Sequence, residues 1–115
     1  MVSIATFTEM ALAYEEAGEQ PHFHKSSFRV RKKIFATLDS QENTVVLKLS
    51  NHEQSVFADL APGIIKPVKG SWGEKGWTEI DLENVSLDIL KYALTTSYCR
   101  VAPKTLAAKY ATSKS

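Results

Sequence analysis

Residues 28–49, FRVRKKIFATLDSQENTVVLKL, alternate between apolar and polar side chains, as a strand with one buried face requires. Phe28 and Val30 fall on one side of the first strand, and Arg29 falls on the other. Apolar residues then recur at every second position in two further strands, at Ile34, Ala36 and Leu38 and at Val45, Leu47 and Leu49. The polar residues 39–43 between these strands are typical of a turn. The stretch predicts an antiparallel meander with one buried face and one partly cationic face.

Helix-capping residues mark the expected starts of the helices. Thr6 is followed by Glu9, and Ser50 by Glu53, with the spacing of a capping box, in which each side chain bonds the backbone amide of the other residue. The residues expected to begin the four helices are Thr6, Ser50, Ser86 and Pro103. We expect the first helix to end at Gly18, because glycine commonly terminates helices.

The remaining segments supply the edges and loops of the sheet. Residues 20–25 lead into the first strand, and residues 64–68 form an edge strand because Pro67 lacks an amide hydrogen. Residues 69–76, KGSWGEKG, have the glycine spacing of a flexible loop, and residues 77–82 form a last strand that begins with a buried tryptophan. The resulting order, α-β(3)-α-β(2)-α(α), predicts an α+β fold with two layers: an antiparallel β-sheet of about five strands with helices on one face.

Length and cysteine content limit the class of protein. A chain of 115 residues has the size of one domain, which we expect to occupy residues 1–111, with residues 112–115 as a flexible tail. The single cysteine excludes an intramolecular disulfide and is typical of a reducing compartment. The sequence contains neither a leader pattern nor an apolar run of about 18 residues. We therefore expect a cytoplasmic protein with no membrane partner.

A net charge of +1 conceals strong segregation of charge along the chain. Residues 1–24 carry four acids and no lysine or arginine, whereas residues 25–33 carry five bases and no acid. Residues 79–88 again hold four acids, and residues 91–115 hold five bases. One interpretation is that opposite charges pair across the fold. The other is that the protein has a cationic face that attracts phosphate groups.

No residue pattern indicates catalysis or a cofactor. Cys99 lies late in a helical pattern, where a small buried residue is the common identity, and no base with an orienting group accompanies it. The glycines of residues 70–76 are not followed by an expected helix, so they do not form a phosphate-binding loop. We expect a protein that is not an enzyme and holds no cofactor.

Two clusters carry side chains that can ligate metals. His22 and His24 would share one face of an extended segment, but a structural zinc site needs four ligands and a catalytic one three. Glu15, Glu16 and Glu19 crowd near the end of the first helix, and such a cluster is more typical of a solvated face. We expect no metal site.

Two basic segments are candidates for contact with double-stranded DNA. The candidate residues are Arg29, Arg31, Lys32, Lys33, Lys66, Lys69, Trp72 and Lys75. The cations would contact phosphate, and Trp72 would sit in a groove or stack on a base. The alternative is that bases along a strand edge only prevent pairing with other sheets.

Four short motifs follow one another along most of the chain. They are FRVRKKIFATL (28–38), VVLKL (45–49), KGSWGEKGW (69–77) and SYCRVAPKTLAAKY (97–110). Together they resemble the MmcQ/YjbR family of small bacterial proteins, over about residues 7–110. The matching positions are Lys33, Phe35 and Ala36, then Val46, Leu47 and Lys48, then Trp77, and finally Val101, Ala102, Pro103 and Lys104.

The resemblance implies an α-β(3)-α-β(2)-α fold of the secretion-chaperone-like or frataxin-like kind. It also implies DNA binding, which for this family is based largely on a double-wing shape made by two hairpins. The sequence departs from the family pattern at Lys32 and His24, where glycine is usual, and at Ser26, where proline is usual. Lys32 adds charge at the tip of one wing.

The leading hypothesis is therefore a non-catalytic DNA-binding protein whose two basic β-hairpin wings contact phosphate. The runner-up is a protein- or peptide-binding module, like a chaperone or adaptor, that holds a protein partner on the open face of the sheet. A third hypothesis, by analogy with frataxin, is cation binding by the acids of the first helix. The sequence does not define the oligomeric state.

Overall fold

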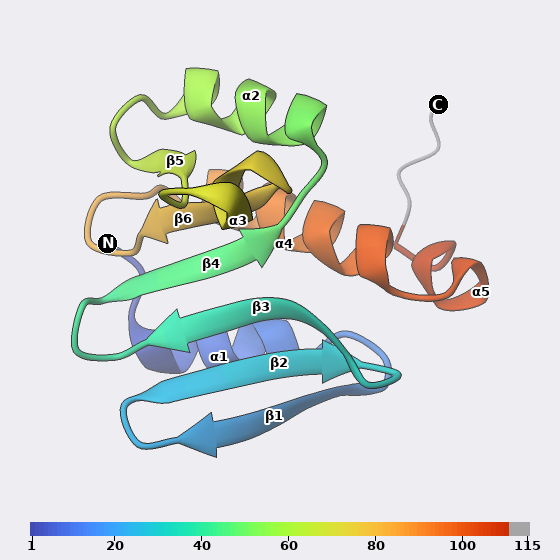
Figure 1. Ribbon diagram of the computed structural model, residues 1–115. Helices are drawn as coiled ribbons and strands as arrows, with labels where there is room; N and C mark the ends of the chain where they lie inside the picture. The colour runs from blue at the N-terminus through green and yellow to red at the C-terminus, as the bar shows by residue number, and fades with distance from the viewer. Residues whose placement is uncertain (111–115) are drawn as a thin grey trace.

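The computed structural model describes residues 1–110 and contains one antiparallel sheet with α1 and α4 packed behind it (Figure 1). The elements, in chain order, are α1 (Ile4–Leu12), β1 (Ala17–His22), β2 (Lys25–Val30), β3 (Lys33–Asp39), β4 (Thr44–Lys48), α2 (Asn51–Leu60), β5 (Ile65–Pro67), α3 (Ser71–Glu74), β6 (Trp77–Asp81), α4 (Leu87–Val101) and α5 (Lys104–Ala107). The two-layer α+β architecture is confirmed. The expected tail, residues 112–115, and residue 111 lie outside the described residues.

The sheet has six strands, in the order β1-β2-β3-β4-β6-β5, rather than about five. The additional strand is β1, which pairs with β2 from Ala17 opposite Val30 to His22 opposite Lys25. The prediction that a helix would continue to Gly18 was wrong, because α1 ends at Leu12. β1 is an edge strand, mostly exposed and without apolar alternation, so no hydrophobic periodicity reveals it.

The start of α1 also differs from the expected capping box. The helix begins at Ile4, and its N-cap is Ser3, whose hydroxyl accepts a hydrogen bond from the Thr6 amide at 3.0 Å. The other predicted caps are confirmed. Ser50 and Glu53 form a complete capping box at α2, Ser86 caps α4, and Pro103 directly precedes α5.

A β-bulge changes the alternation expected for β3. Phe28 pairs with Ala36, but Arg29 pairs with Ile34, so Phe35 is an extra residue in β3. Phe35 and Ala36 are therefore both buried, whereas Ile34 is only partly buried. The inward sets of β2 and β4 are buried as predicted, at Phe28, Val30, Val45, Leu47 and Leu49.

Aromatic side chains join the sheet to the helices behind it. Phe7 of α1 packs edge-on against Phe28, with 5.5 Å between ring centroids. Phe35 packs edge-on against Tyr98 of α4, which stacks on Tyr14 at 4.7 Å. The rings carry much of the contact between the layers, since aromatic side chains bury large areas. None of the helices within residues 1–110 is long and apolar enough to cross a membrane.

Ser97 is a buried polar link between α4 and two strands. Its hydroxyl donates to the Phe35 carbonyl at 2.6 Å and accepts from the Lys48 amide at 3.1 Å. Phe35 lies at the bulge and Lys48 is the last residue of β4, so the hydroxyl satisfies both backbone groups where they leave the regular ladder.

We predict that Ser97→Ala lowers the free energy of unfolding by about 2 kcal/mol, because an unpaired buried polar group costs about 1–3 kcal/mol. Urea denaturation measures this loss. Ser55→Ala is the control, since Ser55 is exposed on α2 and its change should stay within about 0.5 kcal/mol. Equal losses for the two variants would contradict the role assigned to Ser97.

Candidate nucleic-acid interface

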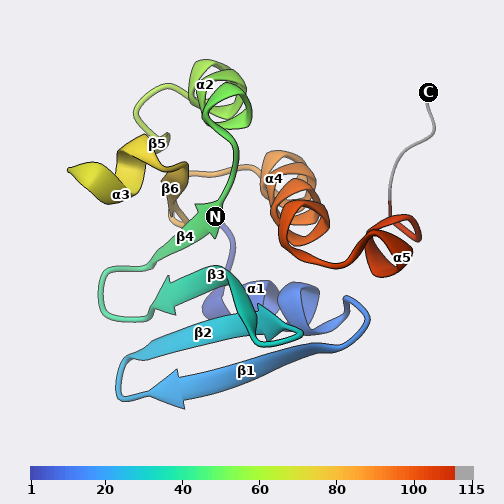
Figure 2. The same cartoon turned by 45° about the vertical axis from the view of Figure 1, so that its right-hand side comes forward.

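The register of the strands gathers several cations at one end of the sheet, although Lys25 lies at the other end, opposite Asp39. Lys48 pairs with Trp77, and Lys33 begins β3 at the same end. We define the basic end by Arg31, Lys32, Lys33, Lys48, Lys69 and Lys75. The opposite end holds the β3–β4 turn and the end of β6, with Asp39, Glu42, Asp81 and Glu83. By register, the two predicted basic segments therefore lie at one end of the sheet, separated by the width of the intervening strands. Figure 2 shows α3 projecting beyond β5 and β6, well apart from the β2–β3 turn.

The β2–β3 turn presents cations at the basic end. Its two central residues, Arg31 and Lys32, have φ values of 51° and 72°, as a type I′ hairpin turn requires. Arg31 binds Glu16 through two hydrogen bonds, of 2.5 and 3.0 Å, and hydrogen bonding to Arg31 contributes most to lowering the pKa of the Glu16 carboxyl. Within residues 1–110, no ion pair of 4.0 Å or shorter involves Lys32, Lys33, Lys69 or Lys75.

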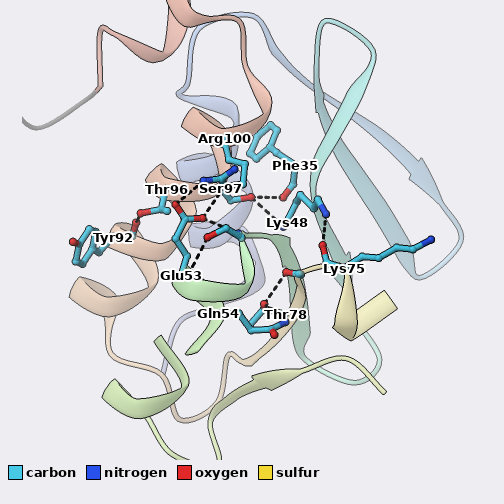
Figure 3. A network of polar contacts seen from close by, with 12 residues as sticks. Phe35, Lys48, Glu53, Gln54, Lys75, Thr78, Tyr92, Thr96, Ser97 and Arg100 are labelled. Carbon is cyan, nitrogen blue, oxygen red and sulfur yellow. Dashed lines mark hydrogen bonds and ion pairs between the residues drawn. The ribbon is translucent and has the colours of Figure 1, made fainter. Parts of the chain in front are cut away.

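The segment expected to be a flexible loop, residues 69–76, instead contains helix α3 and is firmly anchored. The Gln54 side-chain amide is buried and donates to the Gly73 carbonyl at 3.0 Å, to the Trp77 carbonyl at 3.2 Å and to the Thr78 hydroxyl at 3.1 Å. Figure 3 shows Gln54 beside Thr78, with Lys48 and Lys75 close to the same segment. A buried amide with these partners ties α2 to α3 and β6.

Further contacts hold the ends of α3. Asn51 donates from its side-chain amide to the Glu74 carbonyl at 2.9 Å, and the Lys48 ammonium donates to the Lys75 carbonyl. Gly73 and Gly76 allow close packing, because a Cβ at either position would lie 1.8 Å from a backbone oxygen, of Val68 or Leu49 respectively. The segment is thus anchored to α2 and to the chain after β4 and β5, and its short helix projects at the edge of the molecule (Figure 2).

Two tryptophans meet at this end of the sheet. Trp72 of α3 is 61% exposed and contacts Trp77 edge-on, with 6.1 Å between ring centroids. Trp77 was expected in the core, but it is only half-buried, since it lies on the open face of the sheet opposite Lys48. The Lys48 ammonium lies 5.5 Å from the centre of the Trp77 ring, within the range of a cation–π contact.

The other predicted residues lie in positions that are less suited to contact with phosphate. Arg29 lies on the open face of β2, partly buried, and donates to the Ser27 hydroxyl at 3.3 Å. Lys66 lies on the edge strand β5, directly opposite Glu79. Lys48 and Trp77 were missed as site residues, although the alternation of β4 and β6 already assigns them to the open face.

The acids and histidines that were considered for metal binding have structural roles or lie apart. Glu15 binds Lys109 at 2.5 Å, and Glu19 accepts a hydrogen bond from Ser26 at 2.7 Å. His22 ends β1 and His24 lies in the following turn, so the two do not share one strand. Within residues 1–110, no three His, Cys, Asp or Glu side chains gather as a metal site.

Cys99 is poorly suited to nucleophilic attack. Burial raises the pKa of the thiol, so less of the reactive thiolate is present at neutral pH. The thiol donates to the Ala107 carbonyl at 3.6 Å.

A cleft of about 570 Å³ lies between α2 and α4. It is lined by His52, Glu53, Val56, Phe57, Tyr92, Thr95, Thr96, Cys99, Arg100 and Tyr110. Arg100 binds Glu53 through two hydrogen bonds, of 2.8 and 3.2 Å. Burial opposes ionisation of Glu53, but the bonds from Arg100 and from the Ser50 amide outweigh it and lower the pKa of the carboxyl. The polar walls of the cleft are therefore largely satisfied internally, and its exposed apolar residues are Val56 and Tyr92.

We predict that Gly73→Ala displaces α3 and lowers the free energy of unfolding by about 1–3 kcal/mol, the usual cost of overpacking. Thermal denaturation and the emission maximum of tryptophan fluorescence report the two effects. Gly18→Ala is the matched control, because a Cβ at Gly18 meets nothing within 4 Å. If both variants kept the stability and emission of the parent protein, the close packing of α3 would be refuted.

Comparisons with known proteins identify the family. The family model YjbR matches residues 12–100. The fold resembles the crystal structure of the Deinococcus radiodurans protein DR2400, which contains the domain DUF419, with a TM-score of 0.77 and 18% identity. That alignment covers 96% of this chain and 88% of DR2400. No curated protein matches the sequence significantly. The family model spans most of the chain, so this protein belongs to the YjbR family.

Proposed function

We propose that the protein binds DNA without catalysing a reaction, and that the basic end of the sheet contacts the phosphate backbone. The observation that carries the proposal is the gathering of lysines without ion-pair partners within residues 1–110 at one end of the sheet, where they outnumber the acids Glu16 and Glu74. Lys32, Lys33, Lys69 and Lys75 are all exposed at one end. Contacts of this kind position a protein on DNA without specifying a base sequence.

The acids at the opposite end of the sheet favour an approach to DNA in which the basic end comes first. These carboxylates, at Asp39, Glu42, Asp81 and Glu83, would be repelled by phosphate. Arg31 adds to the basic end when Glu16 releases it, and both partners of that ion pair are well exposed to solvent. The protein would therefore approach a nucleic acid with the β2–β3 turn and α3 leading.

We predict that affinity for a labelled DNA falls with salt at a log–log slope of about −4 to −5, since each of four to six neutralised phosphates contributes about −0.9. Fluorescence anisotropy at several salt concentrations measures the slope. The double variants Lys32→Ala/Lys33→Ala and Lys69→Ala/Lys75→Ala should each make the slope shallower by up to about 1.8.

The matched control is Lys25→Ala/Lys91→Ala, which removes the same charge from exposed positions away from the basic end. This control should leave the slope unchanged. If all three double variants made the slope equally shallow, the effect would depend only on net charge and not on the basic end. Absence of DNA binding at low salt would refute the proposed function.

A protein- or peptide-binding role is the second candidate, with a different location from the one first expected. The open face of the sheet is mainly polar, and Val46 and Val68 add apolar surface beside its charged and hydroxyl side chains, at Lys25, Thr37, Asp39, Thr44 and Glu79. The observation that favours a protein partner is the cleft between α2 and α4, where Val56 is 41% and Tyr92 62% exposed. An apolar side chain of a partner would fit there.

We predict that the folded protein enhances the fluorescence of anilinonaphthalene sulfonate, and that Val56→Asp abolishes the enhancement by placing a charge in the cleft. Ser55→Asp, on the neighbouring exposed position, is the control and should retain it. A folded parent protein that fails to enhance the dye would remove support for the second candidate.

A further inference from the structure

Trp72 combines an anchored backbone with a large aromatic side chain that is exposed to solvent. It is 61% exposed, whereas its backbone segment is fixed by the Gln54 amide and by the close packing of Gly73 and Gly76. Tryptophan is usually well buried, so a ring that is preset and uncovered indicates a contact surface. A ring mounted in this way loses little conformational entropy when a partner covers it.

Trp72 continues a strip of side chains across the open face of the sheet. Arg29 pairs with Ile34 between β2 and β3, and Lys48 pairs with Trp77 between β4 and β6, where Trp77 meets Trp72. From β2 to β6 the strip crosses three strand spacings, or about 14 Å. Lys69 and Lys75 flank the tryptophan, each three residues away in the chain.

Cations interleaved with an exposed aromatic ring are the pattern used to bind single-stranded nucleic acid. There, lysine and arginine follow the phosphates while bases stack on aromatic side chains. Stacking of this kind needs the face of an unstacked base, and in a duplex the neighbouring base pairs cover both faces. The exposed ring of Trp72 therefore matches an unpaired strand better than a closed double helix.

The geometry of the two basic segments also disfavours insertion into the major groove of duplex DNA. The β2–β3 turn has only two residues between the strands, and β1 accompanies it to the end, since Ala17 pairs with Val30. Helix α3 spans Ser71–Glu74 and is packed down against Val68. A major groove about 12 Å wide is usually entered by a longer helix or a protruding ribbon, and neither segment supplies one.

We propose that the basic end binds single-stranded DNA in preference to duplex DNA, with a base stacked on Trp72 and phosphates on the lysines beside it. This inference rests on the proposed function, and it defines the form of the nucleic acid. Because any base offers a face for stacking, binding depends little on base sequence.

The test compares a 12-nucleotide oligothymidine with a 12-base-pair duplex, each fluorescently labelled, by anisotropy at one low salt concentration. The parent protein should bind the single strand at least tenfold more tightly. Trp72→Ala should weaken single-strand binding by about 5- to 150-fold, the range for loss of one stacked base, and leave duplex binding unchanged. Trp72→Phe keeps an aromatic face and should restore most of the affinity.

Phe23→Ala is the matched control, because Phe23 is 92% exposed on the β1–β2 turn at the opposite end of the sheet. It should bind both ligands like the parent protein. Equal affinity for the two ligands, or unchanged single-strand binding by Trp72→Ala with its melting temperature preserved, would overturn this inference and leave the proposed function standing. Absence of binding to either ligand would refute the proposed function itself.

Discussion

The buried side-chain amide of Gln54 is the contact on which the candidate site depends. It reaches from α2 to backbone carbonyls of Gly73 and Trp77, which lie 19 and 23 residues further along the chain, and so joins α2 to α3 and β6. Its position depends in turn on the capping box at the start of α2, since Glu53 bonds the Ser50 amide and also binds Arg100 of α4. One helical turn of α2 thus connects the helical layer to the segment that carries Trp72. A buried amide without these partners would cost about 1–3 kcal/mol, which explains why the segment stays seated.

Ion pairing within the fold decides which cations remain available. Arg31, Arg100 and Lys109 each bind a glutamate, as the interpretation that opposite charges pair across the fold anticipates. That pairing is incomplete, because the lysines of the basic end have no such partner among residues 1–110. Opposite charges therefore pair for some residues, whereas these lysines are left without an ion pair within residues 1–110. Exposed ion pairs such as that of Arg31 contribute little to stability, so exchanging Glu16 for a phosphate would cost the fold little.

The sequence predicted those parts of the fold that depend on patterns among neighbouring residues. Alternation located β2, β3 and β4, and capping residues located α2 and α4, because both signals depend on neighbouring residues. β1 escaped prediction because an exposed edge strand is held by backbone bonds to β2 and needs no apolar side chains. The candidate lysines were also visible in the sequence. Local patterns do not show that these lysines share one end of the sheet, that Gln54 anchors α3, or that Lys48 pairs with Trp77. These features depend on contacts and register between segments that are distant in the sequence.

Membership of a family and likeness of fold do not by themselves establish what the site binds, since one fold can hold many sites. What the site can bind depends on its residues, and two glycines determine where they lie. Gly73 and Gly76 let the chain approach the backbone of Val68 and Leu49 closely, which fixes the tryptophan segment beside the ends of β5 and β4. The same packing holds the backbone of Trp72 in place at the edge of a cationic strip. An exposed ring favours the face of a base over the edge of a groove, and this is the physical reason for proposing an unpaired strand as the ligand.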